Sequence, residues 1–375
     1  MKIVNGNYAS AHIFTDAVED YAVAQIQQLC DNEAMADCKI RVMPDVHPGK
    51  VGTIGFTSTL GEKILPNVIG VDIGCGITLA KIKQKKVEFQ KLDKVIRENV
   101  PSGFASRKKL HRFSEEFDFS RLKCQKAINE VKAKLSIGTL GSGNHFIELD
   151  KDDDGNIYVA IHSGSRHLGK EVTEYYLNEG QKHLKQRGLK VPYELTYLEN
   201  GLKEAYLNDL QVVQEFAELN RKVMLDEMVK GMKWKIEEEY SVIHNYVDFS
   251  ATEPILRKGA ISAKEGEIVV IPINMADGIL LGEGLGNEEW NYSAPHGSGR
   301  IMNRENVKNS YTVSQFKSEM KGIYSTCIGK DTLDEAPFAY RRVESIMAAV
   351  QETVTINKII KPIYNFKAGG NDEKR

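Results

Sequence analysis

The sequence predicts one mixed α/β domain. Segments with apolar residues at helical spacing alternate with short runs rich in Val, Ile and Thr. The alternation lacks the regular rhythm of a dinucleotide-binding sheet or a βα barrel. Hydrophobic residues make up 41% and charged residues 27% of 375 positions, which is ordinary for a globular chain. That length allows one large domain or two smaller ones, and we expect one over residues 1–367 with a polar tail over 368–375.

Helices are predicted where apolar residues recur every three or four positions. The longest such pattern spans residues 203–235. The first spans Thr15–Asp31, where Asp16 can act as the N-terminal cap. Further helices are expected over residues 114–135, 167–186 and 338–357.

Strands are predicted where short apolar runs end at turn residues. Residues 38–43 should form a strand that leads into the loop Pro44–Gly49. Residues 50–83 are rich in Gly, Ile, Val and Thr, which indicates several short strands with tight turns. Two more short strands are expected, at residues 158–161 and 268–273.

Composition limits the cellular setting and the kind of partner. The five cysteines are odd in number and form no Cys-x-x-Cys pair, which is typical of a reducing compartment. Neither a signal-peptide apolar region nor a membrane-length apolar run is visible, so we expect a cytoplasmic protein. Because the net charge is −2, any site for a polyanion must be a local patch.

Five of the nine histidines lie in unusual contexts, in glycine-rich loops or at the ends of apolar strands. These five are His47, His145, His162, His244 and His296. Glycine lets backbone approach a ligand closely, and a strand end holds a side chain rigidly. The other four, His12, His111, His167 and His183, lie among charged or helical neighbours and have no predicted role.

Asp72 and Cys75, in the segment GVDIGCG, suit a divalent metal. The alternative is a buried aspartate that caps a turn beside an inert buried cysteine. The histidines favour the metal, because Cys, Asp and His together form a mixed ligand set for Zn, Mn, Co or Fe.

Two similar segments indicate phosphate binding. Arg166 ends the segment HSGSR, and Arg300 ends the segment HGSGR, with Arg304 one turn further on. Small residues supply backbone N–H groups and arginine supplies a planar fork, although a tight turn with a solvated arginine would look the same. Lys258 adds another cation. No P-loop, Gly-x-Gly-x-x-Gly helix start or Lys-x-Asp-Gly segment is present, so histidine is the better covalent carrier for a nucleotide.

These residues together resemble the RtcB-type RNA ligases. The resemblance extends from about Met43 to Lys367. It is carried by the segments PDVHPGK, GVDIGCG, GSGNHFIE, HSGSR, HNYV, RKGA, APHGSGRIMNR and DEAP, in the order of that family.

The resemblance implies a single catalytic domain with a metal site in a central cleft. His296 would carry GMP from GTP, and Asp45 would orient it, while His47 would be structural. Two Mn²⁺ ions would be bound by Asp72, Cys75, His145, His162 and His244. Nucleotide contacts would come from Asn144, Glu148, Asn245, Pro272, Asn274, Met275, Gly297, Ser298, Gly299 and Lys367. Phosphates of RNA or nucleotide would be held by Arg166, Arg300, Arg304 and Lys258.

The implied reaction joins an RNA 2′,3′-cyclic phosphate or 3′-phosphate end to a 5′-hydroxyl end, in RNA repair or tRNA splicing. A monomer is expected, and an archease-like activator is a further implied partner. The segment Pro272–Gly278 departs from the family pattern, because serines that contact guanine are replaced. Three alternatives follow: a metal-dependent cyclic phosphodiesterase, a non-catalytic RNA-binding protein, and a ligase for DNA ends or another nucleotide.

Overall fold

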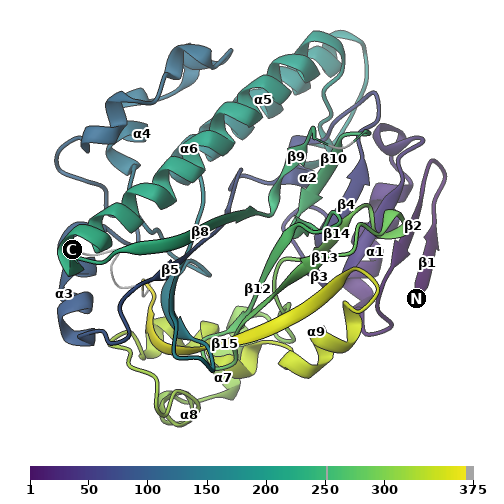
Figure 1. The fold of residues 1–375 in the computed structure, drawn as a ribbon. Coiled ribbons are helices and arrows are strands. Elements are labelled where there is room, and N and C mark those ends of the chain that lie inside the picture. Colours follow the sequence, from purple (N-terminus) through teal and green to yellow (C-terminus); the bar gives the residue numbers. More distant parts are fainter. Residues whose placement is uncertain (251, 369–375) are drawn as a thin grey trace.

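Runs rich in Val, Ile and Thr form the strands of two sheets, which a long helix spans (Figure 1). The computed structural model describes residues 1–250 and 252–368. Within them, the prediction of a mixed α/β domain is confirmed.

The larger sheet is antiparallel throughout its described strands. Its spatial order is β12 (Ile268–Asn274), β13 (Gly278–Gly284), β15 (Val354–Phe366), β6 (Phe146–Lys151), β7 (Ile157–Ser163), β5 (Gly76–Ile82) and β8 (Ile236–Ile243). The strands predicted at residues 158–161 and 268–273 are therefore confirmed as β7 and β12.

The second sheet contains the N-terminal strands. Its order is β1 (Lys2–Asn5), β2 (Ser10–Ile13), β3 (Ile40–Pro48), β4 (Thr53–Thr59), β10 (Ile255–Lys258) and β9 (Asn245–Asp248). The strand predicted at residues 38–43 is confirmed as the start of β3, and the short strands expected within 50–83 are β4 and β5. The loop predicted at Pro44–Gly49 is wrong, because β3 continues through an irregular stretch to Pro48, which pairs with Thr53 of β4. A separate pair is formed by β11 (Ala260–Ser262) and β14 (Ser293–Pro295).

The helices cover the sheets from outside. They are α1 (Asp20–Cys30), α2 (Pro66–Ile69), α3 (Phe89–Asn99), α4 (Glu130–Ser136), α5 (Arg166–Gln186), α6 (Asn200–Met232), α7 (Arg304–Ser310), α8 (Val313–Glu319) and α9 (Val343–Ala349). The helices predicted over residues 167–186 and 203–235 are confirmed as α5 and α6.

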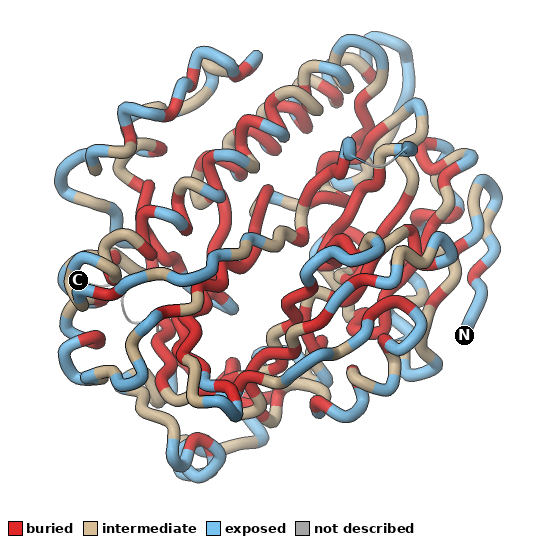
Figure 2. The backbone as a smooth tube through the Cα atoms, in the orientation of Figure 1, coloured by how far each residue is buried: buried red, intermediate tan, exposed pale blue. Residues whose placement is uncertain are grey.

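Helix α6 joins two hydrophobic cores. Its first half buries Val213 and Phe216 in the core that includes Val42 of the second sheet. Its second half buries Met224 in the core that includes Ile147 of the larger sheet. The buried stripe along the inner side of α6 is visible in Figure 2. Because α6 packs in both cores, this one amphipathic helix holds the two sheets together.

Three predicted helices are wrong in extent. Helix α1 begins only at Asp20, because Asp16 pairs with the N-terminal ammonium at 3.1 Å instead of capping the helix. Over residues 114–135, only the part from Glu130 onward is α-helical, and the part before it contains short 3₁₀ turns. Carboxylates such as that of Asp209, which accepts from the Lys123 and Cys124 N–H groups, replace helical hydrogen bonds there.

The helix predicted over residues 338–357 shrinks to α9. The β-branched run VTINKII that follows enters the larger sheet as β15, where it pairs with β13 and β6. Among helices of the described ranges, none has both the length and the apolar character needed to cross a membrane. The predicted tail lies outside the described residues from position 369 onward.

Candidate functional site

Strand ends bring together residues that are far apart in the sequence. Cys75 directly precedes β5, His145 directly precedes β6, and His162 lies near the end of β7. The register places Gly76 opposite Ser163 and Phe146 opposite His162, so all three side chains meet at one end of the larger sheet.

Two groups of potential metal ligands share Cys75. One contains Cys75, His162 and His244, and the other contains Asp72, Cys75 and His145. The Cys75 Sγ lies 3.4 Å from His145 Nε2 and 3.3 Å from His162 Nε2, and the His162 and His244 Nε2 atoms are 3.3 Å apart. Donor atoms about 2.0–2.3 Å from one tetrahedral ion stand roughly 3.3–3.8 Å apart. The separations therefore fit two adjacent cations with Cys75 between them.

Burial keeps His162 and His244 in the neutral form that binds cations. It lowers the pKa of His162 and of His244 well below the ordinary value, with nearby cationic groups acting in the same direction, so both imidazoles are neutral. Burial and the neighbouring Asp72 raise the pKa of the Cys75 thiol. A bound divalent cation would reverse that last effect by favouring the thiolate.

Hydrogen bonds from the far side of the rings orient two of these ligands. The Nδ1 atom of His145 lies 2.9 Å from the carbonyl oxygen of Leu140, and that of His162 lies 3.2 Å from the carbonyl oxygen of Asn144. Such partners direct Nε2 toward a metal. Gly164 allows the backbone to approach Asp72, because a Cβ at position 164 would lie 2.2 Å from its Oδ1.

His296 and Asp45 form a separate pair beside this cluster. The Asp45 carboxylate is fully buried, and its Oδ2 accepts a hydrogen bond from His296 Nδ1 at 2.8 Å. The proton therefore resides on Nδ1 and the Nε2 lone pair is free for nucleophilic attack. The His296 ring centroid is 4.7 Å from that of His244, so the pair adjoins the cation ligands.

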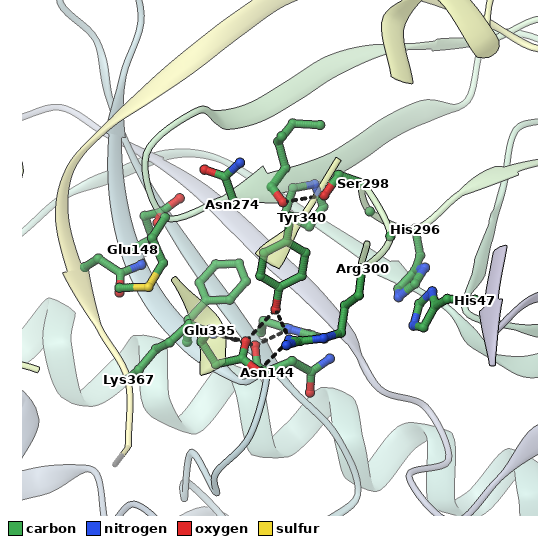
Figure 3. A pocket seen from close by; sticks show the side chains of 18 of the residues that line it. His47, Asn144, Glu148, Asn274, His296, Ser298, Arg300, Glu335, Tyr340 and Lys367 are labelled. Carbon is green, nitrogen blue, oxygen red and sulfur yellow. Dashed lines mark hydrogen bonds and ion pairs between the residues drawn. The ribbon is translucent and has the colours of Figure 1, made fainter. Parts of the chain in front are cut away.

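A cleft extends away from His296 (Figure 3). The space between its lining side chains measures about 160 Å³, and the cleft is open to solvent at one side. Figure 3 shows His296 at one end and Glu148 with Lys367 at the other. Predicted residues that line it are Asn144, Glu148, His162, Pro272, Asn274, Met275, His296, Gly297, Ser298, Gly299, Arg300, Arg304 and Lys367, together with His47.

Glu335 is the main residue of the cleft that the sequence interpretation missed. Its carboxylate contacts Lys367 Nζ at 2.9 Å, Arg300 Nη1 at 3.3 Å and the Arg304 guanidinium, and it accepts from the Tyr340 hydroxyl at 2.6 Å. Burial opposes its charge, but Lys367, Arg304 and Arg300 hold its pKa down at about 2. The segment DEAP was the available signal, since it contains Glu335.

Some residues that were predicted to bind nucleotide or phosphate make other contacts in the structure. Lys258 does not line the cleft: its buried ammonium donates to the carbonyl oxygens of Val51 and Asn67 at 2.6 and 3.0 Å. Asn245 also lies beside the cation ligands rather than in the cleft, and its Nδ2 donates to the Asp72 carbonyl oxygen at 3.1 Å.

The side chains of Arg166 and Asn274 also contact other residues of the protein. Arg166 lies beside the cation ligands, with Nη1 3.0 Å from His145 Nδ1. Asn274 faces the cleft, but its side chain is used by its own turn, donating to Asp277 and accepting from the Ala276 N–H. The polar side chains of the altered Pro272–Gly278 segment are therefore less free to bind a ligand than its composition suggests.

Two buried polar residues on α6 support the site and were also missed. The Arg221 guanidinium donates to the carbonyl oxygens of Gly74 and Ser163 at 2.8 and 3.0 Å. The Asn220 side chain bridges the Gly138–Thr139 and Gly164 backbone. In the sequence, Asn220 and Arg221 are polar residues within the apolar pattern of α6, and this could have indicated that they support the site.

Comparison with known proteins agrees with this arrangement. The sequence model of the family described as tRNA-splicing ligase RtcB matches residues 25–130 and 114–368. The RNA-splicing ligase RtcB of Escherichia coli strain K12 is 31% identical over 371 residues, covering 88% of this chain and 90% of that protein. The tRNA-splicing ligase RtcB of Aeropyrum pernix is 28% identical over 411 residues, covering 85% of each.

Proposed function

Because the chain belongs to the RtcB family of ligases, we propose that it joins RNA ends in a GTP- and Mn²⁺-dependent reaction through a histidine–GMP intermediate. The observation that carries the proposal is the His296–Asp45 pair, which stands between the cation ligands and the cleft. A phosphodiesterase would need the ligands but not this pair.

The first step uses the free lone pair of His296. Its Nε2 attacks the α-phosphorus of GTP, a P–N bond forms, and the bond to pyrophosphate breaks. The Asp45 carboxylate stabilises the positive charge that develops on the ring. The nucleotide then extends along the cleft, with its base near Glu148 and Lys367 at the far end (Figure 3).

The later steps transfer GMP and then release it. A 2′,3′-cyclic phosphate end is first hydrolysed to a 3′-phosphate. An oxygen of that 3′-phosphate attacks the α-phosphorus, and the P–N bond to His296 breaks. The 5′-hydroxyl of the second RNA attacks the 3′-phosphorus, loses its proton and expels GMP, which leaves a 3′,5′-phosphodiester.

The cation ligands and the arginines have distinct roles. Asp72, Cys75, His145, His162 and His244 would hold two Mn²⁺ ions, which neutralise phosphate charge and lower the pKa of a bound hydroxyl. Arg300 and Arg304 line the cleft, where both also pair with Glu335, and Arg166 adjoins the cation ligands. These positions support a role for the three guanidinium groups in binding phosphate oxygens.

The test is covalent labelling. Wild-type protein with α-labelled GTP and Mn²⁺ should acquire label that is acid-labile and alkali-stable. His296→Ala should abolish labelling with metal content near wild type, whereas His183→Ala, at a histidine that pairs with Glu199 outside the cleft, should label normally. No label with any nucleotide would refute the mechanism. Assays with 3′-phosphate and 5′-hydroxyl ends, RNA against DNA, then identify the substrate.

A further inference from the structure

A second carboxyl lies directly behind Glu148 and has no role in the mechanism above. Asp150 follows Glu148 by two residues on β6, so both side chains are on the same face of the sheet. Glu148 is 3% exposed and lines the cleft, whereas Asp150 is 0% exposed and does not. The register places Asp150 opposite Tyr158 of β7 and Pro362 of β15.

Asp150 cannot remain charged in this position. Among the described residues, neither of its oxygens has a hydrogen-bond donor within reach. Burying an ionised carboxylate without a partner is so costly that such a group takes up a proton instead. Burial and the Glu148 charge both raise the pKa of Asp150 well above its ordinary value. The Glu148 carboxylate could accept the proton of Asp150, because the two side chains lie on the same face of β6, two residues apart, and each affects the pKa of the other.

Glu148 is thereby held from two sides. The Asn365 Nδ2 donates to its Oε2 at 2.6 Å, and a protonated Asp150 would donate from the neighbouring position on the same face of β6. Burial raises the pKa of Glu148 to about 7, while Asn365, Asp150 and Lys367 oppose that rise. The Asn365 Oδ1 is buried, has no partner among the described residues, and belongs to a side chain that lines the cleft.

We propose that Asp150 is a positioning residue that keeps a proton between the two carboxyls, so that Glu148 stays a hydrogen-bond acceptor toward the nucleobase. The inference rests on the proposed function, since it takes the cleft to bind a nucleotide. An ionised carboxylate accepts two adjacent N–H groups, which guanine offers at its ring nitrogen and its amino group. Adenine offers a ring acceptor at the same place, so Glu148 would reject it.

The pH dependence follows from the charged groups around the pair. Below about pH 7, Glu148 also takes up a proton and loses its acceptor character. Because the pKa of Asp150 is raised well above its ordinary value by burial and by Glu148, it keeps its proton to a higher pH than an exposed carboxyl, and loss of that proton would leave two buried anions facing each other. Other titratable groups of the surrounding elements are Lys367, Glu335, Tyr158, Asp152 and Lys358. Tyr158 is itself occupied, because its hydroxyl donates to Asp152 at 3.0 Å.

The test measures equilibrium binding of GTP, ITP and ATP to the purified protein by calorimetry between pH 5.5 and 9. Wild-type protein should bind GTP best between an acidic and an alkaline decline. Asp150→Asn keeps a donor toward Glu148 but has no proton to lose, so only the alkaline decline should disappear. Asp150→Leu removes the donor, and should weaken GTP binding by about five-fold or more and shift the acidic decline upward.

Base selectivity provides a second readout that a merely structural role would not move. ITP lacks the amino group, so the wild-type preference for GTP over ITP should shrink in Asp150→Leu. Asp154→Asn, on the exposed turn after the same strand, is the matched control and should behave as wild type. If Asp150→Leu does not fold, Asp150→Asn alone decides the question.

The two proposals fail in different ways. If Asp150→Asn follows the wild-type pH profile throughout, the role of Asp150 is refuted, whatever the labelling shows. If GTP binds with the expected profile but never labels His296, the ligase mechanism is refuted and the role of Asp150 stands. If no nucleotide binds to wild-type protein, both are refuted.

Discussion

Replacing Glu335 by Gln should lower stability at neutral pH and also reduce the loss of stability in acid. The carboxylate is 3% exposed and faces the three cations Lys367, Arg300 and Arg304. Because its folded-state pKa is depressed, its contribution is present above the unfolded pKa and is lost as the pH falls through the folded one.

The magnitude follows from the two pKa values. A carboxyl whose pKa falls from 4.5 to about 2 on folding contributes roughly 3 kcal/mol at neutral pH. Roughly 1.4 kcal/mol of this is gone at pH 3.5. The substitution itself should cost about 3–5 kcal/mol at pH 7, because it also leaves the buried Lys367 and the largely buried Arg300 without this counter-charge.

Equilibrium urea unfolding at several pH values between 7 and 3.5 tests this reasoning. Wild-type protein should lose roughly 1.4 kcal/mol more than Glu335→Gln over that range. Glu305→Gln, at an exposed position of α7, is the control and should have the wild-type pH slope. Parallel slopes for wild type and Glu335→Gln would show that the cations do not hold this carboxyl ionised.

Asp45→Asn should slow GMP labelling of His296 by about 10²–10⁴-fold with unchanged metal content, measured by quenched-flow labelling, because the amide no longer enforces the proton on Nδ1. A wild-type rate would contradict the orienting role. Cys75→Ala should reduce bound Mn²⁺, measured by elemental analysis, since this thiol belongs to both ligand groups; an unchanged stoichiometry would remove it from the ligand set. Gly299→Ala should destabilise the fold by at least about 1–3 kcal/mol in urea unfolding, because φ at 299 is +72° and a Cβ there would lie 2.4 Å from the Asp45 carbonyl oxygen. A fully stable variant would contradict that backbone constraint.

Local context singles out five histidines, including His47, and four of them gather in the structure. His145, His162, His244 and His296 were singled out because each stands in a glycine-rich loop or at a strand end, and the structure brings these four together. The ends of strands can be predicted from short apolar runs, and a side chain at such an end has a restricted orientation because the strand holds its backbone. His47 was read as structural, and its Nδ1 lies 2.9 Å from the Asp45 carbonyl oxygen.

Glu335, Asn365 and Arg221 escaped prediction for a different physical reason. Each acts through partners that are distant in sequence, as in the contact of Glu335 with Lys367 or of Arg221 with Gly74. The spacing of residues along the sequence does not reveal such pairs. The helix expected over residues 338–357 failed similarly, because tertiary pairing of β15 with β13 and β6 overrode the local pattern.

The position of His244 explains how His296 comes to lie beside the potential metal ligands. Asp45 lies on β3 of the second sheet, whereas Cys75 and His162 belong to the larger sheet. The chain passes from β8 of the larger sheet to β9 of the second sheet at His244 (Figure 1). The backbone there is fixed on both sides, since the His244 N–H donates to the Cys75 carbonyl oxygen at 2.9 Å and its own carbonyl accepts from the Gly259 N–H at 2.7 Å. The junction between the sheets, rather than either sheet alone, therefore sets the distance between His296 and the potential metal ligands.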